Sequence, residues 1–233
     1  MDYSKISGII FDFDDTLQDR ESAFRKYAAG FLERHFGGGL APDEAERRVD
    51  EMTKKINGGY VDKREFFMYF KTQWDWKDAP SFEEFLHDYS SIFPTYSTLF
   101  DDAAGVLHEL KRSGYKIGVL TNGLSEMQNL KLRVSGVSGL VDVSVVSGDY
   151  GIEKPDRRIF DIISEKMGID NERLLFVGDH PVNDIQGALG AGMKAVKIKK
   201  GVFADVPAPA GVQTIDRLSE LPALLHAFSP SPA

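Results

Sequence analysis

An apolar run near the start of the chain ends abruptly in acidic residues, and this feature limits the possible folds. Residues 8–11 read Gly-Ile-Ile-Phe, and three aspartates follow within four positions, at Asp12, Asp14 and Asp15. Such a run, rich in β-branched and aromatic residues, is typical of a strand buried on both faces of a parallel sheet. Open parallel sheets bind ligands beyond the carboxyl ends of their strands, so we expect the acids at that edge.

The crowding of these acids favours a metal site. Neighbouring carboxylates repel one another and raise one another's pKa, and a cation among their oxygens relieves the repulsion. Mg²⁺ prefers oxygen ligands of this kind. The alternative is a solvated acidic turn that closes the first strand, and the rest of the sequence decides against it.

The composition argues against several classes of site and partner. Of the 233 residues, 42% are hydrophobic and 27% are charged, as in ordinary globular proteins. The lack of cysteine excludes disulfides and thiolate chemistry, and the five scattered histidines argue against a zinc site. A net charge of −8 without a basic run argues against a nucleic-acid partner. We find no signal peptide or membrane span, and expect a cytoplasmic monomer or homodimer with no membrane partner.

Residues 18–94 differ from the rest of the chain. Their pattern is helical, polar and aromatic, and no further strand of the first kind occurs. Asp62-x-x-Glu65 and Ser81-x-x-Glu84 both have the spacing of capping boxes, which mark the starts of helices. We therefore predict an all-helical insertion of four helices, in which most of the aromatic residues form a core.

The residues after the insertion alternate between strand and helix patterns. Buried strands are expected at 115–120, 141–146 and 174–177, with a weaker one at 195–198 at a sheet edge. Helices are expected around 125–135, 156–167 and 182–191. This alternation predicts an α/β fold, a Rossmann-like parallel sheet covered by helices on both faces, made of residues 1–17 and 95–233.

The predicted strand ends bring different polar residues to one rim. The second strand ends at Thr121-Asn122-Gly123, and a Ser125-x-x-Gln128 capping box begins a helix whose free amides suit an anion. Lys154 follows the third strand, before a helix that Pro155 starts.

The fourth strand adds two acids, Asp179 and Asp184. Carboxylates, a hydroxyl, a lysine and helix N-termini together can hold a divalent metal and a phosphate, as phosphoryl transfer requires. Read singly, Asp184 could be an acid at a helix N-terminus and Lys154 a solvated lysine. The spacing gives His180 no role.

Four motifs in order resemble those of the haloacid dehalogenase-like (HAD) hydrolase superfamily. They are Asp12-x-Asp14-x-Thr16, Thr121, Lys154 and Gly178-Asp179-x-x-x-x-Asp184. Each motif alone occurs by accident, but four in the right order, each after a predicted strand, form a strong signal. The resemblance covers the chain apart from its tail, and residues 18–94 match the family's C1 cap in position and length.

The resemblance implies a role for each motif residue. Asp12 would be the nucleophile that forms an aspartyl-phosphate, and Asp14 would protonate the leaving oxygen and then deprotonate the attacking water. Mg²⁺ would be held by Asp12, Asp179 and the Asp14 carbonyl, with support from Asp184. Phosphoryl oxygens would be bound by Thr121, Asn122 and Lys154, and Lys154 would also offset the charge of Asp12.

Asp14 favours hydrolysis of phosphate esters over dehalogenation. Family members that cleave carbon–halogen bonds lack an acid at this position, because a halide needs no proton to leave. The cap resembles those of small-metabolite phosphatases, among them nucleotidases, phosphoglycolate phosphatases and acylneuraminate-9-phosphatases. We therefore expect a Mg²⁺-dependent phosphatase of a small phosphorylated metabolite, such as a sugar phosphate or a nucleoside monophosphate.

Two alternatives from other classes stay open. A phosphomutase of the same fold would return the phosphoryl group to a sugar, and its turnover would release no net phosphate. A non-enzymatic phospho-acceptor would resemble response-regulator receivers, whose acid pair lies on an earlier strand of a much shorter domain.

Overall fold

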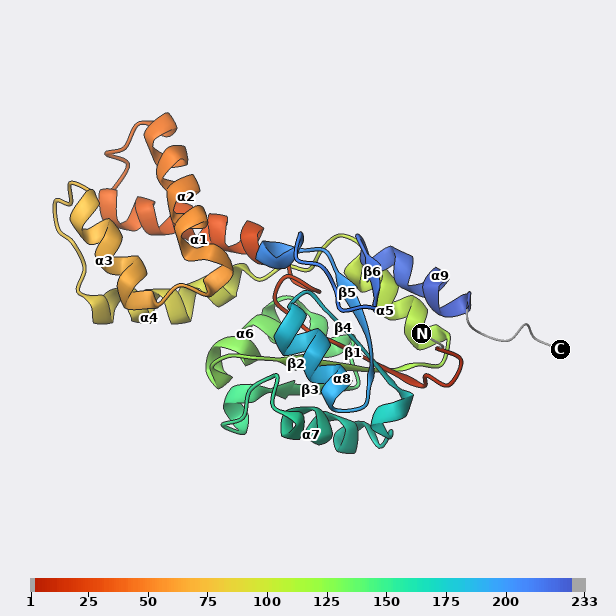
Figure 1. Cartoon of the computed structure of the whole chain (residues 1–233). Coiled ribbons are helices and arrows are strands. Elements are labelled where there is room, and N and C mark those ends of the chain that lie inside the picture. Colours follow the sequence, from red (N-terminus) through yellow and green to blue (C-terminus); the bar gives the residue numbers. More distant parts are fainter. Residues whose placement is uncertain (1–2, 228–233) are drawn as a thin grey trace. The chain divides into compact units, whose positions relative to one another are not determined.

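The computed structural model describes residues 3–227, and the chain divides into two compact units. One unit comprises Met1–Asp19 and Leu99–Ala233, and we call it the core unit. The other, Arg20–Thr98, is the insertion. The boundaries that we expected from the sequence, 17/18 and 94/95, lie a few residues from this division. Figure 1 shows the elements of both units.

The core unit is built on a six-stranded sheet in the order β3-β2-β1-β4-β5-β6, in which all neighbouring strands are parallel. The strands are β1 (Gly8–Phe11), β2 (Lys116–Thr121), β3 (Val143–Val146), β4 (Leu174–Gly178), β5 (Lys194–Ile198) and β6 (Gln213–Ile215). This architecture confirms the predicted α/β fold with a Rossmann-like parallel sheet.

Apolar residues of β1 face two separate cores, as its unbroken apolar run predicts. Ile9 and Phe11 pack in one cluster with apolar side chains of α5 (Ala103–Arg112), α6 (Ser125–Val134) and α9 (Leu221–His226). Ile10 packs on the opposite face with side chains of α7 (Arg157–Met167) and α8 (Gly187–Gly190). Helices therefore cover both faces of the sheet.

The register of the central strands places the motif residues at one edge. Phe11, the last residue of β1, lies opposite Val119 of β2 and Val177 of β4. Both partner strands end within two residues of that level, at Thr121 and Gly178. The segments that follow the three strands therefore leave the sheet at the same rim.

Some of the predicted elements need correction. The prediction that residues 195–198 lie at the sheet edge is wrong, because β6 pairs with β5 and takes that place. The three residues of β6 are too few and too polar to signal a strand, and only Ile215 among them is buried. Pro155 does not start α7, which begins at Arg157 with Asp156 as its N-cap. Residues 181–186 form a π-helical turn ahead of α8, not the start of a regular helix.

The insertion contains four α-helices joined by short turns. They are α1 (Arg20–Phe36), α2 (Pro42–Ile56), α3 (Lys63–Gln73) and α4 (Phe82–Ile92), with 3₁₀ turns at Asn57–Gly59 and Phe93–Tyr96. Edge-to-face and stacked rings join α1, α3 and α4, as in the pairs Phe24–Phe66 and Phe66–Phe85. The aromatic residues thus form a core.

Only one of the two expected capping boxes in the insertion is complete. Ser81 and Glu84 exchange both hydrogen bonds, of 3.1 and 2.7 Å. Asp62 caps α3 through two backbone N–H groups, but the Glu65 carboxylate contacts Lys55 at 2.9 Å. Within residues 3–227, no helix combines the length and apolar character needed to cross a membrane.

Candidate active site

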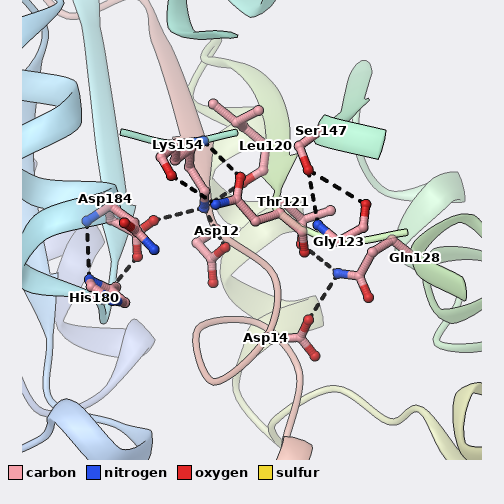
Figure 2. Close-up of polar contacts among 12 residues, drawn as sticks. Asp12, Asp14, Leu120, Thr121, Gly123, Gln128, Ser147, Lys154, His180 and Asp184 are labelled. Atoms are coloured by element: carbon pink, nitrogen blue, oxygen red, sulfur yellow. Dashed lines mark hydrogen bonds and ion pairs between the residues drawn. The ribbon is translucent and has the colours of Figure 1, made fainter. Parts of the chain in front are cut away.

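A tight turn after β1 presents the first two acids of the motif. The Phe13 carbonyl accepts hydrogen bonds from the N–H groups of Thr16, Leu17 and Gln18, at 3.3, 3.0 and 2.8 Å. The turn requires a left-handed conformation at Asp15, whose φ is 61°. Figure 2 shows the result, with Asp12 beside Lys154 and Asp14 beside Gln128.

Lys154 joins two of the predicted site acids. Its Nζ donates to Asp12 Oδ1 at 2.6 Å, to Asp184 Oδ1 at 2.7 Å and to the Leu120 carbonyl at 3.0 Å. These contacts use all three hydrogens of the ammonium. Asp12, Lys154, Asp179 and Asp184 are all buried, and we call these four residues the Asp12 cluster.

Burial and electrostatic interactions change the pKa values of the Asp12 cluster. Burial raises the pKa of Asp12 to about 7, although the adjacent Lys154 acts in the opposite direction. Burial, followed by the Asp184 and Asp12 carboxylates, raises the pKa of Asp179 well above its usual value. Burial alone would lower the pKa of Lys154, but the Asp12 and Asp184 carboxylates outweigh it and raise this pKa. Lys154 therefore stays charged.

The Asp12 cluster fits a divalent metal ion. Asp12, Asp179 and Asp184 each offer a carboxylate oxygen, and these oxygens lie within 4.8 Å of one another. Three carboxylates face one ammonium, so full ionisation leaves an excess of buried negative charge. Hard divalent cations take oxygen ligands of this type, and one such ion would compensate the excess.

The turn after β4 fixes the direction of Asp184. The His180 N–H donates to Asp184 Oδ2 at 2.9 Å, and His180 Nδ1 accepts from the backbone N–H groups of Val182 and Asn183, both at 3.1 Å. A Cβ on Gly178 would lie 2.6 Å from Asp184 Cβ, so this position needs glycine. His180, which the spacing left without a role, caps the turn that carries Asp184.

Asp14 points toward α6. Two side chains of this helix, whose role in the site the sequence analysis missed, contact its carboxyl group. Lys131 Nζ contacts Asp14 Oδ1 at 2.7 Å and Oδ2 at 3.1 Å. Gln128 Nε2 donates to Asp14 Oδ2 at 2.9 Å and to Thr121 Oγ1 at 2.6 Å. We call Asp14, Thr121, Gln128 and Lys131 the Asp14 cluster.

The expected capping box at the start of α6 is wrong. Leu124 is the N-cap, Ser125 makes no capping bond with its side chain, and its hydroxyl contacts the Asp149 carboxylate. The side chain of Gln128 is used inside the site. A usable signal exists in the sequence, because Gln128, Lys131 and the core residue Leu132 share one face of a helix that directly follows the Thr121 motif.

Asn122, for which we expected phosphate binding, contacts the backbone of Lys154. Its Nδ2 donates to the Lys154 carbonyl at 3.0 Å, and its Oδ1 accepts from the Lys154 N–H at 2.9 Å. Asn122 thereby holds the segment that carries Lys154. Of the predicted site residues, Asp12, Lys154 and Asp184 touch directly, Asp179 completes the acid group, and Asp14 and Thr121 meet through Gln128.

Comparisons of the sequence and of the structure with known proteins point to the same family. The model of the haloacid dehalogenase-like hydrolase family matches residues 9–198. A glyceraldehyde 3-phosphate phosphatase of Methanothermobacter thermautotrophicus is 31% identical, over 83% of this chain and 85% of its own. The human N-acylneuraminate-9-phosphatase is 27% identical, over 98% and 97% of the two chains.

A solved structure resembles the chain over nearly its whole length. YfnB of Bacillus subtilis, a HAD hydrolase solved with magnesium bound, superposes with a TM-score of 0.71. The match covers 94% of this chain and 98% of YfnB at 22% identity, a level that shows a shared fold.

Proposed function

The chain belongs to the haloacid dehalogenase-like hydrolases, and we propose that it is a Mg²⁺-dependent phosphatase that hydrolyses a small phosphorylated metabolite through an aspartyl-phosphate. One observation carries this proposal. A buried aspartate after the central strand contacts a buried lysine at 2.6 Å and belongs to a group of three acids. This arrangement suits a carboxylate nucleophile that receives a phosphoryl group from an ester.

In the first step, an oxygen of the Asp12 carboxylate attacks phosphorus. The bond from phosphorus to the ester oxygen breaks, and its electron pair leaves with the alcohol oxygen. Asp14, in its protonated form, gives its proton to that oxygen, so an alcohol departs and Asp12 carries the phosphoryl group. Thr121 would turn its hydroxyl hydrogen from the Asn122 carbonyl, 3.5 Å away, to a phosphoryl oxygen, since Gln128 already donates to the oxygen of this hydroxyl.

In the second step, the Asp14 carboxylate takes a proton from water. The resulting hydroxide attacks phosphorus, and the bond to Asp12 breaks with its electron pair returning to the carboxylate. Inorganic phosphate leaves, and both aspartates regain their starting states once Asp14 again holds a proton. Lys154, held by Asn122, offsets the charge of Asp12 throughout.

The metal is assigned to the acids of the Asp12 cluster. Asp12 and Asp179 would hold Mg²⁺ together with the Asp14 carbonyl, and Asp184 would support it. When bound, the ion supplies positive charge that stabilises the phosphoryl oxygens in the transition state.

We propose small metabolites as substrates for two reasons, the substrates of the relatives and the presence of the helical insertion. The curated relatives act on glyceraldehyde 3-phosphate and on N-acylneuraminate 9-phosphate, as their names state. We assign residues 20–98 the role of a C1-type cap that excludes bulk water and large phosphorylated partners.

Phosphate release from a panel of phosphomonoesters tests the proposal. The panel should hold sugar phosphates, nucleoside monophosphates and p-nitrophenyl phosphate, each with Mg²⁺ and with EDTA. Release that requires Mg²⁺ and is lost in Asp12→Asn is expected. Folded protein that releases no phosphate but exchanges phosphoryl groups between sugar positions would identify a phosphomutase and contradict hydrolysis.

A further inference from the structure

A buried lysine and glutamine on α6 surround the acid that carries protons in the proposed reaction. Lys131 is 1% exposed, and its ammonium contacts both carboxylate oxygens of Asp14. Gln128, also buried, contacts one of these oxygens and the Thr121 hydroxyl.

Burying an ammonium in a helix face is costly. A well-packed apolar side chain in the place of a buried ion pair is often as stable or more stable, so stability alone gives little reason for a lysine at 131. The neighbouring Leu132 is part of the apolar core, which shows that this helix face accepts hydrophobic residues. Lys131 therefore calls for an explanation other than packing.

The contacts restrict the orientation of the Asp14 carboxylate. One donor that reaches both oxygens sets the plane of the group, and a second donor on Oδ2 opposes rotation about the Cβ–Cγ bond. At this contact the amide nitrogen of Gln128 donates and the Asp14 oxygen accepts. The same nitrogen reaches Thr121, which couples the proton carrier to the phosphate-binding hydroxyl.

The glycine of the Thr121-Asn122-Gly123 segment makes room for this arrangement. Gly123 has a φ of 140°, and a Cβ at this position would lie 2.9 Å from Gln128 Cγ. Gln128 therefore packs directly over Gly123. The sequence motif, the glutamine and Asp14 form one connected unit.

We propose that Lys131 and Gln128 are positioning residues that orient the Asp14 carboxyl group, so that its protonated form can give a proton to the leaving alcohol. This inference rests on the proposed phosphatase function. General acids act only within hydrogen-bond reach of the atom that they protonate, and a misplacement of about 1 Å can cost on the order of 100-fold in rate. Lys131 acts through Asp14 and does not itself transfer the proton.

A comparison of leaving groups tests this role. An alkoxide needs a proton as it leaves, whereas p-nitrophenolate is stable without one. The ratio kcat/KM covers the steps up to the first irreversible one, so it reports formation of the aspartyl-phosphate and not its hydrolysis. We compare kcat/KM for p-nitrophenyl phosphate with that for the alkyl ester of the panel that the wild type hydrolyses fastest.

The Lys131→Met variant should lower kcat/KM for the alkyl ester by about 100-fold and for p-nitrophenyl phosphate by less than about threefold. Asp14→Asn, whose kcat/KM is taken from the burst of its first turnover, should show the same selectivity, and adding Lys131→Met to it should have little further effect. Lys131→Arg, which keeps the charge and the donors, should recover most of the alkyl activity. Lys116→Met is the control, since Lys116 is the exposed first residue of β2 and donates to the Met167 carbonyl.

A second variant serves if Lys131→Met fails to fold. Gln128→Met keeps the stem over Gly123 and removes the amide, and it should show the same selectivity for alkyl esters with a smaller loss. Equal losses on both esters, or additive losses in the double variant with Asp14→Asn, would overturn the positioning role and leave the phosphatase function standing. Absence of release by the wild type from every ester would overturn both.

Discussion

The two clusters at the rim differ in how their charges are matched. Each contains a buried lysine that contacts one acid of the same turn, Asp12 or Asp14. In the Asp12 cluster, Lys154 contacts two of the three buried acids, Asp12 and Asp184, and burial raises the pKa of Asp12 to about 7. In the Asp14 cluster, one lysine faces one carboxylate, with a neutral amide and a hydroxyl beside them.

This difference indicates two kinds of chemistry within three residues of sequence. In the proposed mechanism, unmatched negative charge leaves a place for a divalent cation beside Asp12, the proposed nucleophile. A matched pair leaves no excess charge, but it fixes the direction of a group that must meet a proton acceptor. The D-x-D spacing of the turn separates these functions.

The largest effect should come from removing the nucleophile. Asp12→Asn keeps the shape of the side chain but cannot form the aspartyl-phosphate, so phosphate release should fall by at least about 10⁴-fold. Lys154 keeps Asp184 and the Leu120 carbonyl as partners, so the variant should still unfold cooperatively.

The matched control for this variant is Asp161→Asn on an exposed part of α7, where Asp161 contacts Arg157 and Asn171. Wild-type activity is expected of it. Loss of cooperative unfolding in Asp12→Asn would place Asp12 in the structural core instead of a functional site.

Substituting the lysine of each cluster should lower the unfolding free energy by different amounts. Lys154→Met leaves Asp12 and Asp184 buried without their cation, and should cost about 3–5 kcal/mol of unfolding free energy. Lys131→Met should cost less, because the Asp14 side chain is 18% exposed and water can reach it. Urea unfolding without metal measures both, and equal costs would remove the contrast between the clusters.

The unfolding free energy of the metal-free protein should depend on pH because Asp12 ionises among other buried acids. The pKa of Asp12 is about 7 in the folded state, above the 3.8 of an ordinary aspartate, so the folded state holds more protons between these values. Metal-free stability should therefore lose the contribution of this group as pH rises from about 4 to 7.

Other acids, such as Asp142 and Asp156, have lowered pKa values and act in the opposite direction. The difference between wild type and Asp12→Asn reports Asp12 together with its electrostatic coupling to Asp179. Unfolding temperatures from pH 4 to 8 give this difference, which Mg²⁺ should reduce by favouring the ionised form. A difference that does not change with pH would contradict the buried, unmatched charge.

The smallest effect should be a gain in stability. Burial and the nearby acids raise the pKa of Asp179, so Asp179→Asn removes an unfavourable group and should stabilise the metal-free protein by about 0.5–2 kcal/mol. The same variant should lose the stabilisation that Mg²⁺ gives to the wild type. Calorimetry with and without Mg²⁺ measures both, and a destabilised metal-free variant would show that Asp179 is structural.

The sequence predicts the Asp12 cluster better than the Asp14 cluster, for a physical reason. Asp12, Lys154, Asp179 and Asp184 follow strands with strong apolar runs, and parallel strands bring their carboxyl ends together. Lys131 lies inside a helix, where a lysine is usually solvated, and its place on the same helix face as Leu132 is a weak sign of the burial that the fold shows. Gln128 fits a capping pattern that the N-cap at Leu124 does not use.

Short elements were also beyond sequence reasoning. β6 has three residues, two of them exposed, and its pairing with β5 depends on the rest of the sheet. The contacts of Asn122 with Lys154 join loops that lie 32 residues apart, and no local pattern encodes them.

The division of labour between Asp12 and Asp14 can be measured directly with Asp14→Asn, Mg²⁺ and p-nitrophenyl phosphate. Without Asp14, this good leaving group still departs, but no base activates water. We predict a burst of about one equivalent of p-nitrophenolate per enzyme without turnover, with a phosphoryl group located on Asp12 by mass spectrometry of the acid-quenched protein. Steady turnover at the wild-type rate, or an equal burst in Asp12→Asn, would contradict the account.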